Sequence, residues 1–61
     1  MKLAKLRVVA GRNPTAVRAL IELRLGVTTT TRPEGGVWAV YFDAPANVDL
    51  DFLRPDVLPP N

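Results

Sequence analysis

Neither cysteine nor histidine occurs among the 61 residues of this chain. The absence of cysteine excludes disulfides and thiolate metal sites, and the absence of histidine removes the commonest transition-metal ligand and the usual general base. No apolar run approaches the roughly 20 residues that a membrane-spanning helix needs. The sequence therefore predicts a protein with no metal, no cofactor and no membrane partner.

Acidic residues are scarce in the first half of the chain. Residues 1–32 contain seven basic residues and one acidic residue, whereas residues 33–61 contain one basic and five acidic residues. Such segregation favours nucleic acid or an acidic protein surface as a partner, although the two halves could also neutralise each other across the fold. Lys2, Lys5 and Arg7 interrupt what would be the apolar part of a signal peptide, so we expect a cytoplasmic protein.

The longest apolar run, Val37 to Phe42, predicts a buried central strand. β-Branched and aromatic residues suit such a strand, and turn residues flank the run on both sides. Because side chains alternate along a strand, Trp38, Val40 and Phe42 should face the core and Tyr41 the opposite side. We expect truncation of Trp38 to alanine to cost about 3–5 kcal/mol.

Local signals place three further elements. The first strand shows the alternation of a half-buried strand. Asn13 and Pro14 form a helix start, because the asparagine can accept from an unpaired amide and proline has no amide to leave unpaired; Gly26 ends the helix. A threonine-rich stretch suits an edge strand, and Arg32 to Gly36 forms a turn. The expected bounds are 2–10 for the first strand, 14–25 for the helix, 27–31 for the second strand and 37–42 for the third.

This order predicts an α+β fold, β-α-β-β, in which one helix packs on a three-stranded sheet of order 1-3-2. The core domain spans residues 1–43, and it resembles the half-unit of ferredoxin-like folds in topology alone, which implies no activity. Residues 44–61 form an irregular, proline-rich C-terminal tail, in which 48–53 fits either a strand or a short helical turn. The apolar residues of the tail should cover the open face of the sheet or a partner.

Few residues of the sequence are candidates for catalysis or ligand binding. Asp49 and Asp51 share a face if their stretch is extended, but acids in such a tail serve solubility or helix capping more often than catalysis. Arg24 points into the apolar arc of the helix, and its guanidinium either emerges near the helix C-terminus or reaches an anionic ligand at the sheet edge. The sequence shows no nucleophile with its base and no metal-binding set, so we do not expect an enzyme.

We expect a non-catalytic protein-interaction module: an adaptor, assembly subunit or inhibitor of a larger protein complex, as small phage or bacterial regulators are. It would dock through its sheet face, its edge strand or its apolar tail. The alternative is a nucleic-acid-binding protein, in which Lys5 and Arg7 contact phosphates and Tyr41 stacks on a base. Homo-oligomerisation through the 27–31 edge strand is a further expectation. The candidate partner-binding residues are Lys5, Arg7, Arg12, Arg24, Arg32, Tyr41, Phe52 and Leu53.

Overall fold

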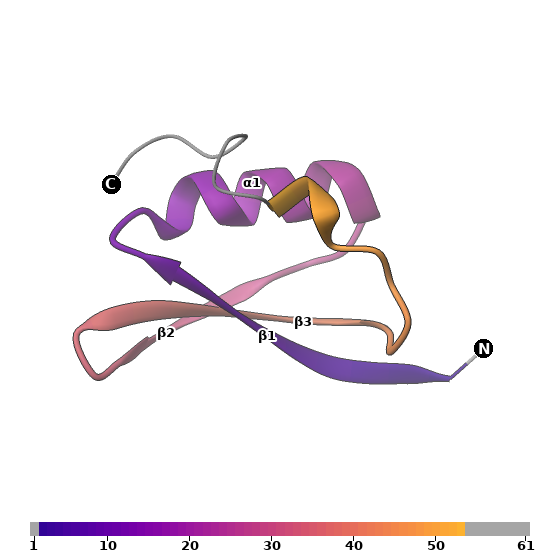
Figure 1. Ribbon diagram of the computed structural model, residues 1–61, viewed down its shortest axis with the longest axis horizontal. Coiled ribbons are helices and arrows are strands. Elements are labelled where there is room, and N and C mark those ends of the chain that lie inside the picture. The colour runs from indigo at the N-terminus through magenta and orange to yellow at the C-terminus, as the bar shows by residue number, and fades with distance from the viewer. Residues whose placement is uncertain (1, 54–61) are drawn as a thin grey trace.

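Three strands and one helix form a two-layer α+β fold in the computed structural model, which describes residues 2–53 (Figure 1). β3 lies between β1 and β2 and pairs antiparallel with both. The predicted fold class and the strand order 1-3-2 are therefore confirmed. The elements in chain order are β1 (Leu3–Gly11), α1 (Pro14–Leu25), β2 (Thr30–Glu34), β3 (Val37–Pro45) and the short 3₁₀ helix η1 (Asp51–Leu53).

Both ends of α1 lie where the capping residues predict them. The Asn13 side chain accepts a hydrogen bond from the backbone N–H of Ala16 at 3.3 Å, and Pro14 occupies the first turn. At the other end Gly26 adopts the left-handed conformation, and its N–H donates to the carbonyl of Glu22 at 2.9 Å. The predicted helix bounds of 14–25 are confirmed.

The second strand begins three residues later than the sequence predicts, at Thr30 rather than at residue 27. Arg32 and Glu34 are strand residues and not part of the turn. Pro33 is tolerated because β2 is an edge strand, where a missing N–H on the outer side removes no ladder bond. Gly35 and Gly36 alone form the turn, with φ of 59° and 90°, and positive φ at both positions suits a two-residue hairpin loop.

Thr29 fixes the connection between α1 and β2. Its side chain is buried, and its hydroxyl donates to Glu22 Oε2 and accepts from Arg18 Nε, both at 2.9 Å. Its backbone N–H donates to the same carboxylate at 3.1 Å, and its carbonyl accepts from Arg18 Nη2 at 3.4 Å. These bonds hold Thr29 outside the strand, so of the 27–31 stretch only Thr30 and Thr31 belong to the β2 edge.

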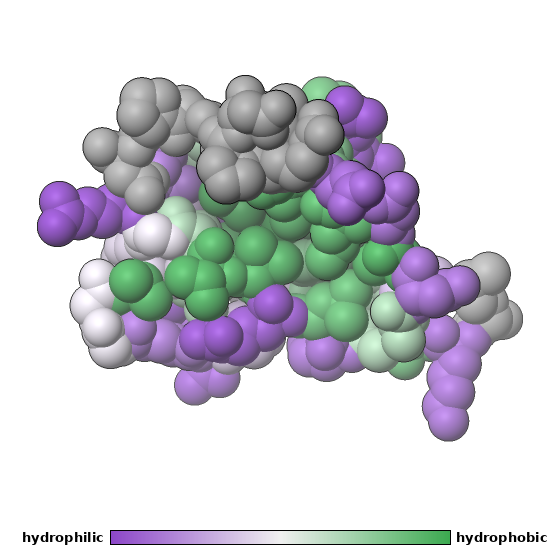
Figure 2. All heavy atoms as spheres, in the orientation of Figure 1, coloured by the Kyte–Doolittle hydropathy of each residue, from purple (hydrophilic) through white to green (hydrophobic). Residues whose placement is uncertain are grey.

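The core lies between α1 and the sheet. Val40 and Phe42 of β3 are almost fully buried and pack with Val17 and Ile21 of α1. Figure 2 shows the corresponding band of apolar side chains between the helix layer and the strands, with hydrophilic side chains beyond the strands. The burial of alternate residues in β3 follows the predicted alternation from Val40 onward.

Trp38 is the exception, and its predicted place in the core is wrong. Its exposed fraction is 39%, and it lies outside the core cluster. In the register its cross-strand neighbours are Gly11 on one side and Pro33 on the other. Neither has a long side chain, so little covers the indole at this end of the sheet.

The chain after β3 returns on the helix side of the sheet (Figure 1). Its apolar residues pack against the core cluster; they are Val48, Leu50, Phe52 and Leu53. The sequence predicts that part of the tail covers the face of the sheet opposite the helix or a partner; the described part, residues 46–53, lies beside α1. Asp49 Oδ1 accepts from the backbone N–H of Asp51 at 2.9 Å, at the start of η1. The remainder of the predicted tail, 54–61, lies outside the described residues.

Candidate functional site

The face of the sheet that points away from α1, called the open face below, is formed by alternate residues of all three strands. The register places Arg7 of β1 opposite Tyr41 of β3. One step along, Ala39 lies between Val9 of β1 and Arg32 of β2. Neither α1 nor the described segment after β3 covers this face (Figure 1).

Glu34 connects the three strands across the open face. Arg7 Nε and Nη2 both contact Glu34 Oε1, at 2.8 Å and 2.6 Å, and the Tyr41 hydroxyl donates to Glu34 Oε2. In the register Glu34 lies opposite Val37, which is four residues before Tyr41 along β3. The side chains of Arg7 and Tyr41 therefore lean along the sheet to reach the carboxylate.

Arg32 completes this group. Its guanidinium carbon lies 5.7 Å from the centroid of the Tyr41 ring, within the range of a cation–π interaction. We call Arg7, Arg32, Glu34 and Tyr41 the open-face cluster. Ala39 lies on the same face and has no exposed surface, although α1 packs on the other side of the sheet. The long side chains of the open-face cluster, which reach along the sheet past Ala39, account for its burial.

The open-face cluster also fixes the charge of Glu34. The hydrogen bonds from Tyr41 and then from Arg7 hold the pKa of Glu34 below its ordinary value of 4.5, and desolvation opposes this shift only in part. The same contact with Glu34 raises the pKa of Arg7 above its ordinary value. Glu34 is thus an anion and Arg7 a cation throughout the neutral pH range.

The rim of the open face along β1 is partly apolar. Leu3 and Val9 have exposed fractions of 60% and 55%. Between them, Lys5 Nζ lies 3.4 Å from Asp43 Oδ1 of β3. Both side chains of this ion pair are more than half exposed, so it contributes little to stability, typically about 0–1 kcal/mol.

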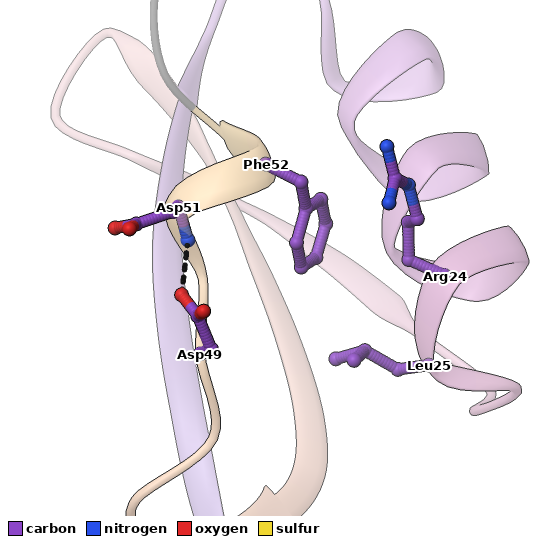
Figure 3. Close-up of a pocket in the computed structure, with 5 residues that line it drawn as sticks. All are labelled: Arg24, Leu25, Asp49, Asp51 and Phe52. Carbon is purple, nitrogen blue, oxygen red and sulfur yellow. Dashed lines mark hydrogen bonds between the residues drawn. The ribbon is translucent and has the colours of Figure 1, made fainter.

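A hollow of about 470 Å³ lies on the helix side and is lined by Arg24, Leu25, Asp49, Asp51 and Phe52 (Figure 3). Its polar groups do not converge on a common point. The carboxylate of Asp51 points away from the hollow, and that of Asp49 is bonded to the chain itself. The guanidinium of Arg24 lies 5.7 Å from the centroid of the Phe52 ring, near the helix C-terminus. These contacts indicate a structural junction between α1 and η1.

The residues predicted to bind a partner fall in three places. The open face carries Lys5, Arg7, Arg32 and Tyr41. The helix side carries Arg24, Phe52 and Leu53. Arg12 is exposed in the β1–α1 connection. The structure thus gathers four of the eight predicted residues on one surface and gives Phe52 and Leu53 a role in packing against the core.

Glu34 is the residue of this surface that the sequence reasoning missed. The sequence places it in a turn, because Pro33 precedes it and two glycines follow. A Gly-Gly pair between two strands is itself the signal of a two-residue hairpin loop. That signal extends the second strand to Glu34 and puts its side chain on a sheet face.

Among residues 2–53, no three acidic side chains lie together as a metal site would require. Within the same part of the chain, no helix is both long and apolar enough to cross a membrane. Comparisons with protein-family models, with curated proteins and with solved structures found no match to this chain.

Proposed function

We propose that this chain is a small non-catalytic protein-interaction module that docks on a larger protein through the open face of its sheet. The observation that supports the proposal is the one-sided arrangement of the fold. α1 and the described segment after β3 cover one face, while the other faces solvent with Leu3 and Val9 exposed. A sheet face that no other element covers is available to a partner, and the exposed Leu3 and Val9 add apolar surface that a partner can bury.

The charges of the open face favour an acidic partner surface. Lys5, Arg7 and Arg32 lie on it together with two acids, Glu34 and Asp43. Each acid forms an ion pair with a residue of β1, while Arg32 forms no ion pair within residues 2–53. Arg32 therefore offers a charge that a partner carboxylate can bind, and Tyr41 holds it in place through the ring.

The arrangement of Tyr41 favours a protein partner over nucleic acid. Stacking of a base requires a free aromatic face. Arg32 lies over the Tyr41 ring, and the Tyr41 hydroxyl is bonded to Glu34. Lys5 and Arg7, the two residues expected to contact phosphates, each hold a carboxylate instead.

Affinity purification of the tagged full chain from its source cells tests the proposal. Arg32→Glu should remove the bound partner, because it reverses the charge of an arginine that forms no ion pair within residues 2–53. Ala19→Glu, on the exposed outer side of α1, is the matched control and should retain the partner. Retention by Arg32→Glu, or loss by both variants, would contradict docking through the open face. Salt-sensitive binding of single-stranded oligonucleotides that Arg32→Glu abolishes would instead support the nucleic-acid alternative.

A further inference from the structure

The outer edge of β1 is the longest unpaired strand edge in the described part of the chain. Within residues 2–53 the nine residues of β1 pair only with β3, so the backbone groups on its outer side have no strand partner in this part of the chain. The β2 edge has five residues and includes Pro33, which has no N–H. β1 contains no proline, and its register irregularity lies at its end, between Val9 and Gly11. Such an edge is a template for another strand.

Apolar side chains flank this edge on both sides of the sheet. Leu3 and Val9 are exposed on the open face, and Leu6 and Val8 are only partly buried on the helix side. Figure 2, in which β1 lies in front, shows an apolar band beside the strands at this edge. A strand added here would cover apolar surface as well as backbone groups.

We infer that β1 pairs antiparallel with β1 of a second copy, with the two Leu6 residues opposite each other. The product is a six-stranded sheet with both helices on the same face. In this register Leu3 lies opposite Val9 of the second copy, and the two-fold symmetry produces that apolar pair twice. A shift of the register by two residues would place Leu3 opposite Arg7, or Val9 opposite Lys5, and would leave the apolar pairs unmade.

The exposed apolar residues of β1, and not its charges, favour a second copy over an acidic strand as the occupant. The same register places Lys5 opposite Arg7 of the second copy, which disfavours pairing when both charges are free. Both side chains form ion pairs with acids of the neighbouring strands, Lys5 with Asp43 of β3 at 3.4 Å and Arg7 with Glu34 of β2 at 2.6 Å. These ion pairs turn the positive charge away from the edge. They reduce the repulsion between copies and also the attraction for an acidic segment.

The dimer is independent of the identity of the protein partner. Arg32 lies on β2 and Tyr41 on β3, and neither is on the β1 edge, so edge pairing leaves both accessible. The dimer would present two open faces side by side. A failure of dimerisation would therefore leave the Arg32→Glu experiment unaffected.

Sedimentation equilibrium of the full chain over a concentration series tests the inference. The mass should double with concentration, and Val9→Lys should weaken the dimer about tenfold, because it replaces two apolar pairs and adds charge. Thr30→Lys, on the open face of β2, is the control and should leave the dimer unchanged. A monomer at all concentrations, or equal weakening by both variants, would overturn the inference.

Cross-linking tests the register. The chain lacks cysteine, so single cysteines report specific pairs. A mixture of Leu3→Cys and Val9→Cys chains should form the mixed disulfide faster than either chain forms a disulfide with itself, because cross-strand neighbours are within disulfide reach. Both positions are exposed, so neither substitution disturbs the core. Equal rates for the mixed and the self-paired disulfides would overturn the register.

Discussion

Thr29 offers a sharp test of how this small fold is held together. Replacing Thr29 with valine keeps the shape of the side chain and removes its hydroxyl. Two hydrogen bonds are then lost, one donated to Glu22 and one accepted from Arg18. Each is worth about 0.5–1.5 kcal/mol net. Both partner side chains are about 40% exposed, so water can replace the lost bonds in part. We expect Thr29→Val to destabilise the fold by about 1–2 kcal/mol.

That loss is large for a chain of this size. A domain of 61 residues is stable by roughly 3–9 kcal/mol, and a loss of 1 kcal/mol lowers the Tm of such a domain by about 4–8 °C. Thermal melts at neutral pH measure the effect. Thr28→Val is the matched control, because Thr28 is exposed and makes no side-chain hydrogen bond in the described structure. Its stability should stay within about 0.5 kcal/mol of the wild type.

The pH dependence of the Thr29→Val effect supplies a second readout. The Thr29 hydroxyl and N–H hold the pKa of Glu22 below its ordinary value of 4.5. The folded state therefore binds this proton more weakly than the unfolded state, so the stabilisation is full above pH 4.5 and is lost as the pH falls. The difference in the free energy of unfolding between the wild type and Thr29→Val should therefore become smaller in acid. A difference that stays constant, or that is absent at neutral pH, would refute the role assigned to Thr29.

Three further predictions concern the core, the hairpin and the open face. Phe42→Ala should cost about 3–5 kcal/mol and Trp38→Ala less than about 2 kcal/mol in urea unfolding, and the reverse order would contradict the placement of the core. Gly36→Ala should cost about 1–2 kcal/mol in the same assay, because φ is 90° there; an unchanged midpoint would exclude that conformation. The pKa of Glu34 is lowered in the fold, so Glu34→Gln should lose less stability below pH 4.5 than the wild type loses. If the Tm of the variant falls with pH as steeply as the Tm of the wild type, the contact of Glu34 with Arg7 and Tyr41 is disproved.

The order of elements could be predicted because each rests on local signals. The helix begins and ends at residues whose side chains or conformations cap it, Asn13 and Gly26. The strand order followed from the apolar character of the third strand, which the structure places in the centre. Both kinds of signal lie within a few residues along the chain, and the structure confirms them.

The open-face cluster could not be predicted in full, because it depends on contacts between distant residues. Arg7 and Glu34 are 27 positions apart, and their contact requires the second strand to extend to Glu34. Trp38 was misplaced for a similar reason. The alternation of side chains along a strand predicts which face of the sheet Trp38 lies on. Its exposure depends in addition on its small cross-strand neighbours, which only the register shows.

Site-specific photo-cross-linking in the source cells tests the central claim, that the open face docks a protein partner. A photoreactive residue at Thr30, which is exposed on the open face beside Tyr41, should capture one protein. The same residue at Ala19, on the outer side of α1, should capture none. Capture of the same protein from both positions, or from Ala19 alone, would contradict the account.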